Sequence, residues 1–129
     1  MKQATIGVKL HLTTAENNHL ITAYDKNFIE VNRQRHAKSM IVMPQQLIID
    51  WEVLDFAHLT TEHFIKIAAL NAEVVLLGTG EKHQFLHPRT YQALTAKGIP
   101  LECMTTAAAC RTYNILMSEG RNVVAALIL

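Results

Sequence analysis

The sequence is poor in cysteine, in aromatic residues and in net charge. Its two cysteines, Cys103 and Cys110, are too few for the disulfide framework of a small secreted domain and favour buried structural thiols. A formal net charge of +1 and 6% aromatic residues supply neither the basic stripe nor the aromatic platform of a nucleic-acid-binding protein. No apolar run approaches the roughly 20 residues that span a bilayer, and no leader segment is recognisable. We therefore expect a cytoplasmic protein without direct membrane insertion.

Complete catalytic and metal-binding motifs are also missing. The segment Gly78-Thr79-Gly80 lacks the third glycine of a dinucleotide fingerprint, which would fall at His83, and no GxxxxGK[ST] phosphate loop occurs. Pairs of histidines lie four or five residues apart, but no third ligand stands at a diagnostic spacing. Cys110 has no histidine nearby in the sequence to activate it as a nucleophile. We expect no metal, no cofactor and no catalytic residue. These expectations argue against an enzyme but do not decide the question.

The N-terminal part of the chain is predicted to be rich in strands. Residues 1–18 alternate weakly and predict a frayed or edge strand. Asp25-Lys26-Asn27 suits a tight turn, and residues 32–35 suit a second, polar one. Apolar runs predict short strands over residues 20–24, 28–31, 39–43 and 47–49. The first 50 residues are thus predicted to form a small antiparallel meander.

The character of the sequence changes after Trp51. The apolar residues of the stretch 51–59 show no clean periodicity. This stretch is therefore predicted to be a connection whose aromatic side chains serve for packing. Beyond it, helices are predicted to start at Thr60 or Thr61, at Pro88, and at Thr105 or Thr106. Wholly or largely apolar runs predict strands over residues 74–77, 99–104 and 123–129. This alternation predicts an α/β fold with a largely parallel sheet, and the meander is expected to pack onto it within a single domain, 1–129.

The last predicted helix is the best specified element. Tyr113, Leu116 and Met117 lie three and four residues apart, with Ala109 one turn earlier, so one stripe of the helix is expected to face the sheet. Gly120 is suited to the left-handed conformation that ends a helix. The apolar segment that follows it has no polar alternation, which predicts a strand buried on both faces.

The topology predicts one candidate pocket. Parallel strands would open their carboxyl ends on the same edge of the sheet, which would place Gly78-Thr79-Gly80 beside Thr105 and Thr106. Backbone amides of the glycine loop, the helix N-terminus, Lys82 and Arg111 would then favour a carboxylate or a phosphate. A purely structural interpretation is also open, in which the glycines form a turn, the threonines cap the helix and Arg111 pairs with an acidic neighbour.

Several stretches together resemble a known family, the small Mth-like domain of unknown function. They are HFIKIAALNAEVVLLGTG, the proline-started helix, GIPLECM and ACRTYNILMSEGR, which occur in the family's order between Ile21 and Ile128. The family includes stand-alone bacterial and archaeal proteins, an adipogenesis-associated animal protein and a mitochondrial assembly factor of respiratory complex I. The resemblance implies a three-layer α/β fold in which a β-rich N-terminal part packs on a mixed central sheet, and it implies no catalytic residue.

The resemblance also suggests a shared functional surface and two competing functions. The family motif residues expected on that surface are Gly78, Thr79, Gly80, Thr106, Arg111, Thr112, Tyr113 and Asn114. We expect a non-catalytic interaction or assembly factor whose protein partner is unknown, with respiratory complex subunits as candidates. The alternative is a module, or an enzyme, that binds a small anionic molecule through the glycine loop and the helix N-terminus. Exposed edge strands of the meander also allow a homo-oligomer.

Overall fold

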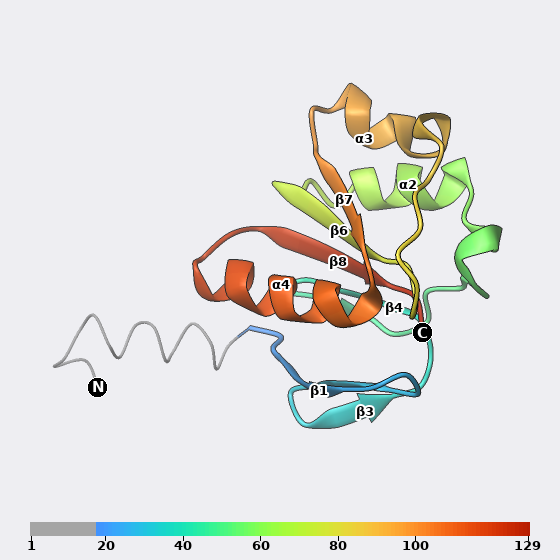
Figure 1. The fold of residues 1–129 in the computed structure, drawn as a ribbon. Coiled ribbons are helices and arrows are strands. Elements are labelled where there is room, and N and C mark those ends of the chain that lie inside the picture. Colours follow the sequence, from blue (N-terminus) through green and yellow to red (C-terminus); the bar gives the residue numbers. More distant parts are fainter. Residues whose placement is uncertain (1–17) are drawn as a thin grey trace, which may run out of the picture.

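The computed structural model describes residues 18–129 and contains two β-sheets and several helices (Figure 1). The strands are β1 (Ile21–Tyr24), β2 (Ile29–Val31), β3 (Gln34–His36), β4 (Met40–Val42), β5 (Leu47–Ile48), β6 (Val74–Gly78), β7 (Leu101–Met104) and β8 (Val123–Leu127). The helices are η1 (Phe56–His58), α2 (Thr61–Ala68), η2 (Pro88–Tyr91), α3 (Gln92–Ala96) and α4 (Thr106–Ser118). Residues 1–17 of the strand predicted over residues 1–18 lie outside the described residues.

The central sheet has the strand order β5-β4-β8-β6-β7. β6 runs parallel to both β7 and β8, whereas β4 pairs antiparallel with β5 and β8. The sheet is therefore mixed, with as many antiparallel as parallel pairings, and not largely parallel as predicted. The apolar run after Gly120 forms the middle strand, β8, and every residue of β8 is buried. This confirms the prediction of a strand covered on both faces, because helices lie over each side of a central strand in such a sheet.

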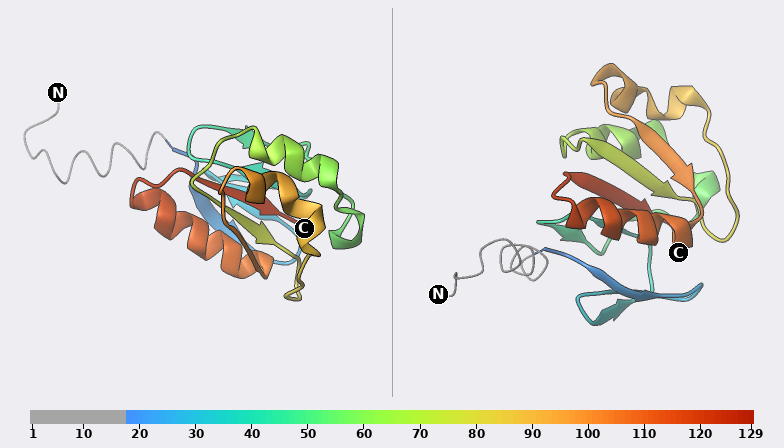
Figure 2. Two further views of the ribbon diagram at one scale, coloured as in Figure 1. Left: turned by 90° about the horizontal axis from the view of Figure 1, so that it is seen from above. Right: turned by 60° about the vertical axis from the view of Figure 1, so that its left-hand side comes forward.

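The central sheet and the helices on its two faces form three layers, and the small sheet packs on the outer side of α4. α2 and α3 contact each other on one face of the central sheet, and α4 packs on β6 and β8 from the other face. Figure 2 shows the small sheet β1-β2-β3 on the same side as α4, which lies between it and the central sheet. Ile21, Ile29 and Val31 from the small sheet share a hydrophobic cluster with Tyr113 of α4. The predicted three-layer α/β architecture is therefore confirmed, but the small sheet packs on α4 and not, as had been expected, on the central sheet.

The predicted N-terminal meander is wrong in its extent. Only β1, β2 and β3 form a separate antiparallel sheet, because β4 and β5 leave it and join the central sheet beside β8. The polar turn predicted over residues 32–35 is shorter than expected: only Asn32 and Arg33 turn, with φ of 49° and 72°. Such a pair of left-handed residues makes the two-residue turn that matches the twist of a hairpin. The polar residues after it form β3, a strand that the sequence analysis missed.

The predicted helix starts agree with the structure. Thr60 precedes α2, and the inner face of that helix consists of Phe64, Ile67 and Ala68. The helix expected at Pro88 begins as the 3₁₀ turn η2 and continues as α3, and Leu94 is its buried residue. No helix in residues 18–129 is both long enough and apolar enough to cross a membrane.

Candidate functional site

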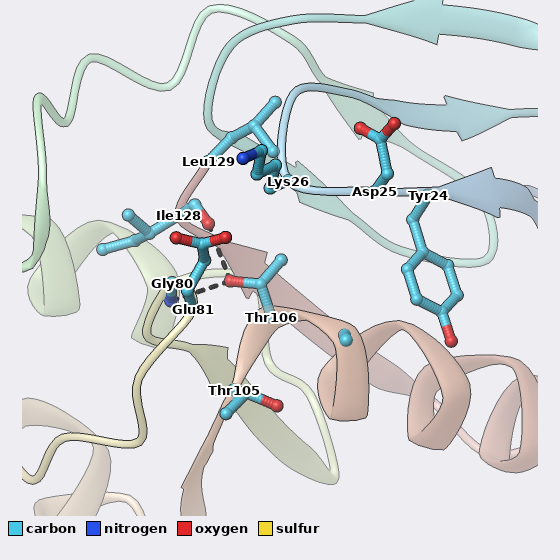
Figure 3. Close-up of a pocket in the computed structure, with 10 residues that line it drawn as sticks. Tyr24, Asp25, Lys26, Gly80, Glu81, Thr105, Thr106, Ile128 and Leu129 are labelled. Atoms are coloured by element: carbon cyan, nitrogen blue, oxygen red, sulfur yellow. Dashed lines mark hydrogen bonds between the residues drawn. The ribbon is translucent and has the colours of Figure 1, made fainter.

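The carboxyl ends of β6 and β7 meet the start of α4, as the topology predicted. Thr105 caps α4, since its hydroxyl accepts the backbone N–H of Ala108 at 3.2 Å. The Thr106 hydroxyl accepts the backbone N–H of Gly80 at 2.9 Å and donates to the carbonyl oxygen of Ile128 at 2.7 Å (Figure 3). The Thr106 N–H in turn donates to the Gly80 carbonyl at 2.9 Å. Thr106 therefore joins the glycine loop, α4 and the segment after β8.

Gly78 is required by the close approach of β6 to α4. A Cβ atom on this residue would lie 2.9 Å from both the Cα and the Oγ1 of Thr106, and 3.1 Å from Cδ2 of Leu127. Side chains do not reach such distances without a shift of the surrounding backbone. The first glycine of the loop is therefore required for packing.

Thr79 organises the loop that follows it. Its side chain is 2% exposed, and its hydroxyl accepts the backbone N–H of Gln84 at 3.2 Å and lies 2.5 Å from the Lys82 carbonyl oxygen. The loop 81–87 is thereby fixed to the end of β6. It presents Phe85, which is 77% exposed and whose ring centroid lies 4.4 Å from that of His83. An exposed aromatic side chain on a fixed loop is a feature of protein-binding surfaces.

A cavity of about 340 Å³ opens beside this junction. Figure 3 shows that the hairpin turn between β1 and β2 forms its second wall. The sequence analysis anticipated the contributions of Gly80 and Thr106 but missed those of the hairpin. Its full lining is Tyr24, Asp25, Lys26, Gly80, Glu81, Thr105, Thr106, Ala107, Ile128 and Leu129. No sequence pattern links the two walls, because they come together only when the small sheet packs on α4.

The chemistry of the cavity does not favour an anionic ligand. Asp25 and Glu81 line it together with a single cation, Lys26. Lys82 is not among the lining residues, and the Arg111 guanidinium donates to the Tyr24 hydroxyl at 3.1 Å. The Thr106 amide and both threonine hydroxyls are already bonded within the protein. A bound carboxylate or phosphate would therefore meet two carboxylates and few free donors. Arg111 also has a phenol as its partner, not the acidic neighbour of the structural interpretation.

The remaining predicted site residues lie outside the cavity. Tyr113 is fully buried, so it cannot belong to an exposed surface, and its hydroxyl donates to the His19 carbonyl oxygen at 2.6 Å. The side chain of Asn114 accepts the N–H of Ile21 at 3.0 Å and donates to its carbonyl at 2.7 Å. Asn114 thus attaches β1 to α4, and Tyr113 attaches the segment before β1. The burial of Tyr113 corrects its place on the shared surface expected from the resemblance. Thr112 is half-buried on the same helix.

The cysteines have the properties of structural thiols. Neither is paired: Cys110 is fully buried and Cys103 is partly buried. Burial raises the pKa of the Cys110 thiol to about 12 and also raises the pKa of Cys103. A thiol with such a pKa forms little thiolate near neutral pH, and the thiolate is the nucleophile. Within residues 18–129, no three His, Cys, Asp or Glu side chains gather as they would around a metal ion.

Comparisons with known proteins agree with the resemblance seen in the sequence. Residues 21–128 match the family described as "Protein of unknown function (DUF498/DUF598)". NADH dehydrogenase [ubiquinone] 1 alpha subcomplex assembly factor 3 of Mus musculus is 34% identical over 110 residues, which are 84% of this chain and 59% of the mouse protein. The chain thus spans less than two thirds of the length of that relative.

Solved structures support the same fold. A crystal structure of a Bordetella parapertussis protein has a TM-score of 0.81 and 40% identity, covering 86% of this chain and 95% of that one. A solution NMR structure from Bordetella pertussis, described as a Mth938-like domain, has a TM-score of 0.76 and 32% identity, covering 99% and 92%. These likenesses confirm the Mth-like fold.

Proposed function

The chain belongs to the DUF498/DUF598 family, and we propose that it is a non-catalytic assembly factor that binds a subunit of a membrane-bound respiratory complex before that complex is complete. The observation that carries the proposal is its similarity to assembly factor 3 of NADH dehydrogenase over most of the described chain. The partner is a protein, and we propose that it is a subunit of an NADH dehydrogenase.

The bonding of the candidate site supports binding rather than catalysis. The hydroxyls of Thr79, Thr105 and Thr106 hold backbone groups of their own chain, so none is poised to attack or to orient a substrate. The Cys110 thiol is buried and its pKa is raised to about 12, which removes it as a nucleophile at neutral pH. The polar groups here stabilise the fold and fix the loop that they carry.

We place the partner contact on the loop surface, which we define as Lys26, Glu81, His83 and Phe85. Phe85 is the most exposed large apolar side chain of the described residues, and the same loop carries the exposed charged residues Glu81 and Lys82. An aromatic anchor within a polar rim is the usual composition of an energetic centre in a protein interface. The loop is held by Thr79, so little conformational entropy is lost when a partner binds it.

Retention of partners from solubilised membranes tests the proposal. The tagged chain is incubated with a detergent extract of the cells that express it, and the bound proteins are identified by mass spectrometry. We expect subunits of an NADH dehydrogenase, and we expect Phe85→Ser to reduce their recovery at least about tenfold, as loss of an interface anchor does. Ile115→Ser is the matched control, because Ile115 is also exposed and apolar but lies on α4. Equal recovery with both variants would remove the loop surface from the proposal.

The proposal places this activity in the cytoplasm, at the face of the membrane complex. Two unpaired thiols, one of them fully buried, suit a reducing compartment. Binding of nucleic acid forms no part of the proposal, because the net charge of +1 provides no attraction for a polyanion.

A further inference from the structure

A second hollow lies away from the loop surface. A groove of about 990 Å³ is lined on one side by residues 35–39, between β3 and β4, and on the other by residues 49–54, between β5 and η1. Ile49 is 50% exposed and Leu54 is 76% exposed at its edge. β5, which leads into the second wall, is the outer strand of the central sheet on this side. We name this region the Trp51 surface and define it as Lys38, Ile49, Asp50, Trp51, Glu52 and Leu54.

Trp51 gives the surface a fixed aromatic centre. Its ring meets the His63 ring edge to face, with centroids 6.0 Å apart. Trp51 also lines a smaller hollow of about 430 Å³ on its other side, with His63 and Lys66. Trp51 therefore contributes to both hollows, and its ring contacts His63 of α2. Rigid aromatic side chains of this kind contribute strongly to association because they lose little freedom on binding.

The two walls of the groove carry opposite charges. Arg35 and Lys38 lie on the first wall, and Asp50 and Glu52 lie on the second. Arg35 pairs with Glu30 at 3.3 Å. Lys38, Asp50 and Glu52 are exposed and make no ion pair with another residue of the described part of the chain. Unpaired basic and acidic groups thus line the two walls of one groove.

This arrangement is complementary to itself after a rotation of 180°. In a two-fold interface, each contact between two residues occurs twice with the roles of the copies exchanged. A second copy would lay its acidic wall along the basic wall of the first and insert its Leu54 and Ile49 into the groove. A partner carrying one sign of charge would instead be repelled by one of the walls. We therefore propose that the chain forms a two-fold dimer through the Trp51 surface, with Lys38 of each copy facing Asp50 of the other.

Sedimentation velocity of the full chain over a range of concentrations tests the dimer. The proposal predicts a concentration-dependent shift from the 14.5 kDa chain to a species of twice that mass. Leu54→Ser is expected to weaken association at least about tenfold, because the variant removes an exposed apolar side chain that the dimer would bury. Leu54 is largely exposed in one copy, so the variant should keep the thermal stability of the parent chain.

Charge exchange tests the orientation of the two copies. Lys38→Glu places two carboxylates opposite each other, and Asp50→Lys places two ammonium groups opposite each other, so each variant alone should associate about tenfold more weakly. An equimolar mixture of the two variants should recover association, because each mixed pair again joins opposite charges. Lys82→Glu and Glu119→Lys make the same charge changes at exposed positions elsewhere and serve as controls.

Each outcome decides a part of the inference. A single 14.5 kDa species at all concentrations would overturn it, and would point to a different protein as the occupant of the groove. A dimer that is indifferent to Leu54→Ser would place the interface elsewhere. Loss in both charge variants without recovery in the mixture would overturn the pairing of Lys38 with Asp50. None of these variants changes a residue of the loop surface, although the Lys82→Glu control lies beside it. The assembly proposal is therefore tested separately.

Discussion

Replacing Thr106 by valine tests the junction on which the candidate site is built. Valine has nearly the shape of threonine but no hydroxyl, so the variant removes two hydrogen bonds without opening a cavity. The backbone N–H of Gly80 and the carbonyl oxygen of Ile128 would lose the partners that lie 2.9 Å and 2.7 Å away. Ile128 is 4% exposed, so water has little access to the released carbonyl.

The expected magnitude follows from those two orphaned groups. A buried polar group without a partner costs about 1–3 kcal/mol, and the partly exposed Gly80 amide should cost less because water can reach it. We therefore expect Thr106→Val to lower the free energy of unfolding by about 2–4 kcal/mol. Urea denaturation followed by circular dichroism measures this difference directly.

Thr112→Val is the matched control for this prediction. Thr112 lies on the same helix, is half-buried, and its hydroxyl makes no hydrogen bond to residues 18–129. The control should change the free energy of unfolding by less than about 0.5 kcal/mol. If Thr106→Val costs no more than Thr112→Val, the hydroxyl of Thr106 does not join the loop to the end of β8 and the reasoning is refuted.

Three further predictions test neighbouring parts of the structure. Gly78→Ala should cost about 1–3 kcal/mol by overpacking against Thr106, measured by urea denaturation, and a neutral result would contradict the close approach. Asn114→Ala should release β1, so hydrogen exchange at Ile21 should accelerate, while unchanged exchange would show that the side chain does not hold the strand. Burial raises the pKa of Cys110 from its ordinary value of 9.0 to about 12. Above pH 9 the unfolded thiol therefore loses its proton first, and the free energy of unfolding should fall by up to about 1.4 kcal/mol per pH unit. The Cys110→Ala variant should lose the part of this fall that comes from the thiol. An identical pH dependence of the free energy of unfolding in the variant would contradict the prediction.

Local patterns in the sequence were sufficient to predict most helices and strands. Asp25 shows why: its carboxylate accepts the backbone amides of Asn27 and Phe28 at 2.7 Å and 3.2 Å, so the turn between β1 and β2 is specified by its own residues. The stripe of α4 was likewise predicted from spacing: Ala109, Tyr113 and Met117 are buried, and Leu116 is partly buried against the same cluster. Where the backbone conformation depends on neighbouring residues, the sequence was a reliable guide.

Predictions failed where partners distant in the sequence decide the structure. β4 looked like a further strand of the meander, but its pairing with β8 joins residues more than 80 positions apart. β3 was missed because its exposed, polar residues resemble a loop, although the two left-handed residues before it are a hairpin signal. The same limit applies to the cavity, where Lys26 meets Gly80 only through the docking of the small sheet.

The roles of single residues were harder to predict than their positions. The glycine loop and Thr106 lie together as expected, yet their polar groups are bonded to each other. Tyr113 stood in a motif shared with the family and was expected at a functional surface, but it is a buried anchor for the segment before β1. A motif of this kind can be retained for packing alone, and only contacts in three dimensions separate the two cases.

The most direct test of the assembly proposal is the amount of complete NADH dehydrogenase in cells that lack this chain. Native gel electrophoresis of solubilised membranes, followed by an in-gel activity stain, measures the assembled complex. The account predicts that the complete complex falls, that partly assembled forms accumulate, and that the parent chain restores assembly while Phe85→Ser does not. An unchanged amount of complete complex in cells lacking the chain would contradict the account.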